Sequence, residues 1–328
     1  MRSQRFFSTL RALQSHDNPL GLPRSGTPPS FPRRRGLPEK RKIRDVNKVI
    51  AVSSAKGGVG KSTIAVNLAL AFARRGIRTG ILDTDIFGPS IPTLLNLSGE
   101  PRLDDKNCLV PLTNYGLKSM SMGYLLPPPP QPTEPDASGY QPMDTTPISW
   151  RGLMVTKAMH QLLHSVSWGP LDVLIMDFPP GTGDVQLTIG QEIVVDGSVI
   201  VSTPQDIALR DAVRGYGMFQ RMNIPVLGMV RNMAFFACPH CGKQTKIFSR
   251  GEHSHQDHDH ETDRGVTAEC KRLGIDFLGD IPLDAKVCED ADRGVPTMVA
   301  EESDDRSARR NAFLGIAEKV AQKVGLPW

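Results

Sequence analysis

A strand, a glycine-rich loop and a helix follow one another in the segment "VIAVSSAKGGVGKSTIAVNLALAFARRG", residues 49–76. The β-branched run at 49–55 predicts a buried strand, and residues 61–75 have a helical pattern that ends at Gly76. A strand that leads through a tight loop into a helix belongs to a parallel sheet with right-handed crossovers. This segment therefore restricts the chain to an α/β fold.

Short apolar runs continue the alternation along the chain. Such runs are apolar on both faces, as strands of a buried parallel sheet are. Strands are expected at 49–55, 79–83, 172–178, 198–204, 225–230 and 276–282, with further helices at 205–222 and about 303–324. The pattern predicts a doubly wound, mostly parallel sheet over residues 45–328. No apolar run is long enough to predict a transmembrane helix.

The glycine-rich loop has the composition of a phosphate-binding site. Gly57, Gly58 and Gly60 allow backbone N–H groups to surround phosphate oxygens at the positive end of the following helix. Lys61 is expected to reach the β- and γ-phosphates, and the Ser62 hydroxyl to ligate Mg²⁺. The predicted loop comprises Gly57, Gly58, Val59, Gly60, Lys61, Ser62 and Thr63.

Polar residues follow three of the other expected strands. Asp83 and Asp85 come at the carboxyl end of one strand, where ligands bind in open α/β sheets. A turn-capping role explains Asp83 nearly as well. Asp177 ends a strand of four apolar residues and is expected to hold Mg²⁺ through water. Asn232 offers an amide that matches an adenine edge, or else caps its own turn.

Cys238 and Cys241 form a CxxC motif in "CPHCG". A redox dithiol, a zinc knuckle, an iron–sulfur ligand pair and a buried structural pair remain open. Zinc requires four ligands and the chain has no second CxxC, whereas two copies supply four thiolates for zinc or for a [4Fe–4S] cluster. Cys270 and Cys288 are expected to be packing residues.

The basic charge of the chain is concentrated at its start. Residues 1–44 contain eleven Lys or Arg and two acidic residues, whereas the remainder is mildly acidic, so nucleic-acid binding is not expected. The Arg- and Ser-rich leader is typical of a mitochondrial transit peptide followed by a flexible basic lead-in, with a disordered basic tail as the alternative. We expect residues 1–44 to lie outside the folded domain.

Two segments interrupt the α/β pattern and are expected to be disordered insertions. Residues 127–147 contain eight prolines, which exclude a helix or a central strand. Residues 250–264 carry His253, His255, His258 and His260 among acidic residues. This tract is either a solvated loop or a metal-loading segment.

The loop "KGGVGKST" resembles that of the P-loop ATPases with a deviant Walker A motif, the class of the MinD and Mrp proteins. The resemblance implies that Lys56 reaches the nucleotide of a partner subunit, that the active form is a homodimer and that the nucleotide is ATP. It also implies that Asp85 positions or activates the attacking water, and that Asp83 lies near Mg²⁺. Lys56, Lys61 and Asp85 are therefore the candidate catalytic residues; a solvent-exposed Lys56 is the alternative.

The motifs KGGVGKST, DTDIFGPSIP, MDFPPGTGD, VRNM, CPHC and GDIPLD occur in an order and spacing similar to those of the Mrp/NUBPL family of iron–sulfur carrier ATPases, over about residues 46–325. This resemblance implies a [4Fe–4S] cluster bridged by Cys238 and Cys241 of two subunits, with slow ATP hydrolysis coupled to cluster transfer. Together with the leader, it implies a place in the mitochondrial matrix and apo-proteins of respiratory complex I as acceptors.

Two other functions compete with a cluster carrier. One is a zinc-stabilised, nucleotide-dependent interaction module, which uses the same cysteines. The other is an organiser ATPase that binds membrane or DNA, supported by a C-terminal helix with Phe313, Ile316, Ala317, Val320 and Val324 on one face. A helix docked on the sheet explains that face more simply, so membrane contact is not favoured.

Overall fold

The computed structural model describes residues 40–125, 152–238, 241, 243–248, 265–304 and 306–328. Residues 1–38 form a separate unit from residues 39–328. The expected transit peptide, both expected insertions and the histidine tract therefore lie wholly or almost wholly outside the described residues.

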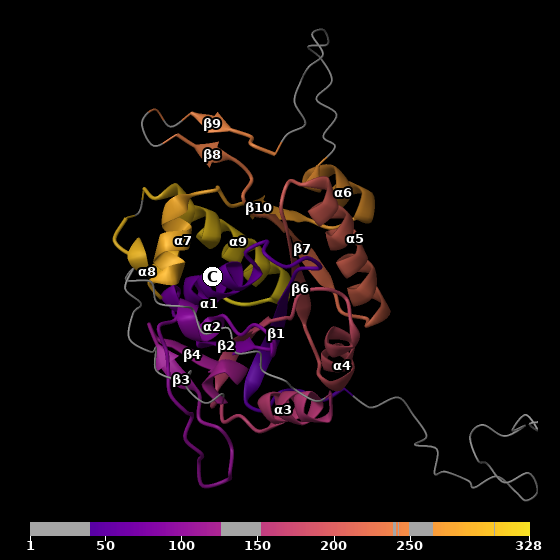
Figure 1. The fold of residues 1–328 in the computed structure, drawn as a ribbon, viewed down its shortest axis with the longest axis vertical. Coiled ribbons are helices and arrows are strands. Elements are labelled where there is room, and N and C mark those ends of the chain that lie inside the picture. Colours follow the sequence, from indigo (N-terminus) through magenta and orange to yellow (C-terminus); the bar gives the residue numbers. More distant parts are fainter. Residues whose placement is uncertain (1–39, 126–151, 239–240, 242, 249–264, 305) are drawn as a thin grey trace, which may run out of the picture. The chain divides into compact units, whose positions relative to one another are not determined.

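The folded unit is built on one eight-stranded sheet with the strand order β10-β7-β6-β1-β5-β2-β4-β3 (Figure 1). All neighbouring strands are parallel except β3 and β4, which form an antiparallel edge. The strands are β1 Val46–Ser53, β2 Thr79–Asp83, β3 Leu112–Asn114, β4 Leu117–Ser121, β5 Leu171–Asp177, β6 Gly197–Ser202, β7 Val226–Arg231 and β10 Phe277–Asp280.

Helices cover both faces of the sheet (Figure 1). One apolar layer includes residues of α1, α2, α8 and α9, and the other includes residues of α3, α4, α5 and α6. The helices are α1 Lys61–Arg74, α2 Ile91–Leu94, α3 Gly152–His164, α4 Asp184–Glu192, α5 Asp206–Arg221, α6 Val266–Leu273, α7 Ala285–Asp292, α8 Thr297–Ala300 and α9 Ala308–Val324, with a 3₁₀ helix at Met122–Leu125. The doubly wound fold is confirmed.

Several boundaries differ from those expected. The first strand starts at Val46, and α9 starts at Ala308, where the Ser307 hydroxyl accepts the N–H of Arg310 as an N-cap. The β3–β4 edge was not predicted, because its strands are short. Ile43 is buried, and Arg41 donates its N–H to the carbonyl of Glu192. Residues 40–44, assigned above to the lead-in, therefore belong to the folded unit.

The parallel sheet gathers the carboxyl ends of its strands at one edge. In the register of β2 and β5, Asp83 lies beside Asp177, and Val52 of β1 pairs with Asp177 on its other side. Strand β7 ends on the same edge, immediately before Asn232. Residues from four separate parts of the sequence are brought together in this way.

Helix α9 packs against α1 and β10. The five apolar residues expected on one face of this helix are all buried. The C-terminal Trp328 continues the contact, because its ring meets that of Phe72 edge-on at 6.1 Å. Among the described residues, no helix is both long and apolar enough to cross a membrane.

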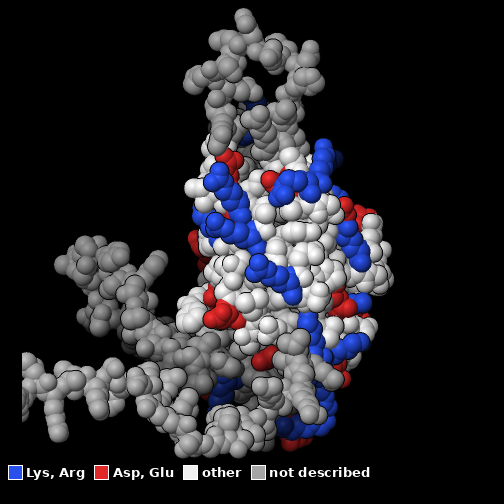
Figure 2. All heavy atoms as spheres, turned by 90° about the vertical axis from the view of Figure 1, so that its right-hand side faces the viewer, with Lys and Arg blue, Asp and Glu red and all other residues white. Residues whose placement is uncertain are grey.

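Basic and acidic side chains share the face formed by α5 and α6 (Figure 2). Arg214 pairs with Asp211 on α5, and Arg272 pairs with Glu269 on α6. These ion pairs are exposed and each contributes at most about 1 kcal/mol to stability.

Candidate functional site

The glycine-rich loop joins β1 to α1 in a backbone conformation that requires glycine. Gly58 and Gly60 have φ values of 76° and 81°, in the left-handed region. A Cβ atom on Gly60 would lie 2.3 Å from Nδ2 of Asn232. Both the backbone angle and the close contact exclude a larger residue at position 60, so the loop keeps its curled shape in front of α1.

A cavity of about 450 Å³ opens over this loop. Its size is within the range of small-molecule sites, about 300–1,000 Å³. The predicted residues that line it are Gly57, Gly58, Gly60, Lys61, Ser62, Thr63, Asp85 and Asn232. Residues of the C-terminal part, including Asp284, Cys288 and Phe313, form the rest of the wall. The cavity therefore unites the loop with segments more than half the chain away.

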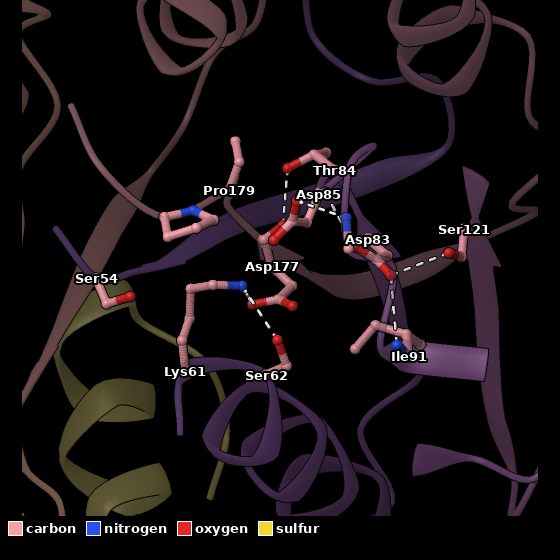
Figure 3. A network of polar contacts seen from close by, with 12 residues as sticks. Ser54, Lys61, Ser62, Asp83, Thr84, Asp85, Ile91, Ser121, Asp177 and Pro179 are labelled. Atoms are coloured by element: carbon pink, nitrogen blue, oxygen red, sulfur yellow. Dashed lines mark hydrogen bonds and ion pairs between the residues drawn. The ribbon is translucent and has the colours of Figure 1, made fainter. Parts of the chain in front are cut away.

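Lys61 is directed at the end of β5 (Figure 3). Its Nζ lies 2.5 Å from Oδ1 of Asp177 and 3.1 Å from Oγ of Ser62, and both charged side chains are buried. Oδ2 of Asp177 is shielded from solvent and has no hydrogen-bond partner in the described part of the chain. A buried carboxylate oxygen without a partner can accept a hydrogen bond from a water molecule bound to Mg²⁺.

Asp83 is completely buried and is held by three donors. The N–H of Asp85, the N–H of Ile91 and the hydroxyl of Ser121 reach its carboxylate at 3.0, 3.3 and 3.0 Å (Figure 3). Burial, and then the negative charge of Asp177, raise the pKa of Asp83 from 3.8 to about 7. The carboxyl group is thus poised between its charged and neutral forms near neutral pH.

This raised pKa predicts how the stability of the nucleotide-free, magnesium-free protein depends on pH. Folded Asp83 keeps a proton that the unfolded chain releases, so its contribution to stability is lost as pH rises from about 4 to about 7. The Asp83→Asn variant is expected to lose that part of the slope in thermal melts. Asp172→Asn is the control: Arg78 lowers the pKa of Asp172, so its contribution changes below this window. An unchanged slope in Asp83→Asn contradicts the assignment.

Asp85 lies on the loop after β2 and is half-buried on the cavity wall. Its Oδ1 accepts the N–H of Gly88 at 3.3 Å, and burial raises its pKa. The neighbouring Thr84 donates its hydroxyl to the carbonyl of Asp177 at 2.7 Å, which ties this loop to the end of β5. Phe87, two residues beyond Asp85, is 68% exposed.

Asn232 lines the cavity and contacts the glycine-rich loop. Its Nδ2 donates to the carbonyl of Val59 at 2.8 Å, and the residue is buried. The amide donor is thus used to hold the phosphate-binding loop, which the sequence did not reveal because the two residues are far apart in the chain. A contact with adenine stays a prediction.

Lys56 is half-buried, and its carbonyl accepts the hydroxyl of Ser54 at 2.9 Å. It does not line the cavity described above, whereas Lys61 does. The two lysines of the loop therefore have different surroundings. The expected contact of Lys56 with the nucleotide of a partner subunit stays a prediction.

The CxxC motif is carried by a two-stranded hairpin separate from the main sheet. Strand β8 (Phe236–Ala237) pairs with β9 (Gln244–Thr245), and the N–H of Cys238 donates to the carbonyl of Lys243 at 3.0 Å. Cys238 is half-buried and Cys241 is exposed. A turn with one exposed and one half-buried thiol suits a metal or cluster that must be reached from outside.

Two further cysteines differ from each other. Cys270 is buried as expected of a packing residue. The expectation for Cys288 was wrong, because Cys288 is exposed and lines the nucleotide-sized cavity. Cys288 is exposed because α7 lies over the cavity. The spacing of apolar residues in α7 did not show which side of the helix faces the cavity.

The family model described as the NUBPL iron-transfer P-loop NTPase of the ParA group matches residues 45–321. The chain belongs to this family. It is 44% identical over 292 residues to the mouse iron-sulfur cluster transfer protein NUBPL, covering 88% of this chain and 82% of the mouse protein. It is 40% identical to an Arabidopsis thaliana protein named as an iron-sulfur protein required for NADH dehydrogenase, mitochondrial, over 86% of this chain and 80% of that one.

Solved structures resemble the NUBPL-family fold seen here. A nucleotide-binding protein from Archaeoglobus fulgidus, solved in complex with ADP, is 32% identical with a TM-score of 0.63, covering 83% of this chain and 94% of that chain. The cell-division ATPase MinD of Pyrococcus furiosus is 16% identical with a TM-score of 0.53, covering 84% and 99%. The latter likeness concerns the fold alone.

Proposed function

We propose that this protein is an ATP-binding carrier that assembles [4Fe–4S] clusters and delivers them to target proteins. Cys238 and Cys241 of two subunits together supply the four thiolates of one cluster. The names of the mouse and plant relatives support the cargo. The cluster is cargo in this proposal, and ATP and Mg²⁺ occupy the cavity above the glycine-rich loop.

The observation that carries the proposal is the connection between the cysteine hairpin and the nucleotide site. Asn232, which holds the carbonyl of Val59, is only six residues before Cys238. The N–H of Ala234 donates to the carbonyl of Ile281 at 2.9 Å, and Phe236 pairs with Leu283, next to cavity residue Asp284. A nucleotide-dependent shift of the loop or of the cavity wall would therefore move the hairpin.

Ligand count supports a homodimer. Among the described residues, no third His, Cys, Asp or Glu lies close enough to Cys238 and Cys241 to complete a metal site. A second copy supplies the missing pair. Two observations fit a partner surface at the nucleotide site: Phe87 is exposed close to Asp85, and Lys56 does not line the cavity of its own chain.

Residues in and around the cavity have separate roles in the proposed ATP hydrolysis. With ATP and Mg²⁺ bound, Lys61 would neutralise charge on the β- and γ-phosphates. Ser62 would hold Mg²⁺ directly and Asp177 would hold it through water, and the ion would supply further positive charge at the phosphates. Asp85 orients the attacking water, and Lys56 reaches the partner's nucleotide. Asp83 braces the loop that carries Asp85 through its contact with the N–H of Asp85. Slow turnover is expected, as in other P-loop switches without an activator.

The proposed place of this protein is the mitochondrial matrix, where it would deliver clusters to apo-proteins. A transit-like leader and the mitochondrial plant relative support import into the mitochondrial matrix. Apo-proteins of respiratory complex I are the proposed acceptors, from the name of the same relative. The membrane- or DNA-organiser alternative loses its main feature, because the apolar face of α9 is buried. A zinc-stabilised interaction module remains the alternative function, and the reconstitution experiment below distinguishes the two.

Anaerobic reconstitution with iron and sulfide tests the proposal. The expected product is a brown dimer with about four irons and four sulfides per pair of chains. It should pass its cluster to an apo-ferredoxin acceptor at a rate that changes when ATP is added. A colourless protein that retains zinc through the same cysteines would contradict the carrier function and favour the interaction module.

A further inference from the structure

Two histidines and a glutamate meet on the side of the sheet covered by α3 and α4. His160 and His164 are four residues apart on α3, so they lie on the same face of the helix, and their ring centroids are 4.6 Å apart. Glu192 is the last residue of α4. None of the three lines the nucleotide cavity, and α3 and α4 lie far from the cysteine hairpin (Figure 1).

The spacing of these side chains is that of metal ligands. One donor atom from each of the three residues lies within 4.8 Å of the others, and they are the one such group among the described residues. Nε2 of His164 is 3.6 Å from Oε2 of Glu192. In a tetrahedral zinc site, bonds of about 2.0–2.1 Å place ligand atoms roughly 3.4 Å apart. Small side-chain rotations are therefore enough to close the site.

Glu192 gives an independent reason to expect a ligand. Its Oε2 is shielded from solvent and has no hydrogen-bond partner in the described part of the chain. The 3.6 Å separation from His164 is too long for a hydrogen bond. Buried polar atoms are satisfied in nearly all proteins, and a cation would satisfy this oxygen. The backbone of Glu192 is fixed by the N–H of Arg41, at 2.8 Å from its carbonyl.

We propose that His160, His164 and Glu192 bind one divalent cation of the zinc class, with a fourth position open to water. Two imidazoles and one carboxylate suit Zn²⁺ and Co²⁺ rather than Mg²⁺ or Ca²⁺, which prefer oxygen ligands. His160 is exposed, so the ion has a route from solvent. A bound ion would join the end of α3 to the end of α4, the helix that starts directly after the loop following Asp177.

The test uses the full chain without the CxxC cysteines and without the histidines of residues 253–260. This background carries alanine at Cys238, Cys241, His253, His255, His258 and His260. Equilibrium dialysis with Zn²⁺ is expected to give one bound ion per chain. Co²⁺ is expected to give visible d–d bands without the thiolate charge-transfer absorption that a cysteine site would show.

Replacing the ligands separates this site from adventitious binding. His160→Gln, His164→Gln and Glu192→Gln, each in that background, are expected to weaken zinc binding at least about tenfold. Lys157→Ala, one turn earlier on α3, is the control and is expected to bind as the background does. Zinc should also raise the melting temperature of the background and of Lys157→Ala, but not of His160→Gln/His164→Gln.

Two results would overturn the proposal. One is a background protein that takes up no stoichiometric zinc, which would leave His164 and Glu192 as an ion pair only. The other is zinc uptake that is the same with and without His160 and His164. Because the cluster-binding cysteines are absent from every variant, neither result bears on the carrier function.

Discussion

Replacing Cys238 and Cys241 with alanine is expected to abolish cluster binding and leave ATP affinity unchanged. The two thiols lie in the turn of the β8–β9 hairpin, outside the nucleotide cavity. A [4Fe–4S] cluster shared by two chains loses every protein ligand in the double variant and half of them in each single variant. Iron and sulfide content after anaerobic reconstitution, together with ATP titration of the same samples, measures both effects.

Cys108→Ala is the matched control for this loss. Cys108 is a half-buried free cysteine in a loop remote in sequence from the hairpin, and its replacement is expected to leave iron content at the wild-type level. If the double cysteine variant still held about four irons per dimer, the cluster would lie elsewhere and the hairpin would have another role. If the double cysteine variant also lost ATP binding, the cysteines would be needed to form the nucleotide site itself, contrary to their position outside the cavity.

Replacing each lysine of the glycine-rich loop is expected to affect ATP binding and ATP hydrolysis differently. Lys61→Ala is expected to lower ATP affinity about 100-fold, because charged hydrogen bonds contribute about 1.5–3 kcal/mol each and tenfold in affinity is about 1.4 kcal/mol. Lys56→Ala is expected to keep ATP affinity within about twofold while losing hydrolysis that depends on dimer formation. Equilibrium binding of ATP and phosphate release at several protein concentrations separate these outcomes.

Of the two lysines, only Lys61 is also expected to affect the stability of the fold, because it is paired with the buried Asp177. Removing Lys61 leaves the buried carboxylate of Asp177 without its partner, and breaking such a pair costs about 3–5 kcal/mol. The double variant Lys61→Ala/Asp177→Asn is therefore expected to regain much of this stability in denaturant titrations but none of the ATP affinity. Equal losses of affinity in Lys56→Ala and Lys61→Ala would contradict the division of roles.

The local chemistry of this protein could be predicted from the sequence because it depends on neighbours in the chain. Glycines before a helix predict a phosphate-binding loop, and the apolar runs that end in Asp83 and Asp177 predict carboxylates at the edge of a parallel sheet. The helices and strands that were missed, such as β3 and β4, are short and lie at the edge of the sheet. Their alternation of apolar and polar residues covers too few positions to predict a strand.

Contacts between distant segments were decided only by the tertiary structure. The register of β2 and β5 puts Asp83 beside Asp177 and raises the pKa of Asp83 to about 7. The end of β7 places Asn232 beside Val59, and the ends of α3 and α4 place His164 near Glu192. The sequence by itself determined which chemical groups are present and which strand ends carry them. Only folding decided which groups meet, because direction and distance between remote side chains depend on how whole elements pack.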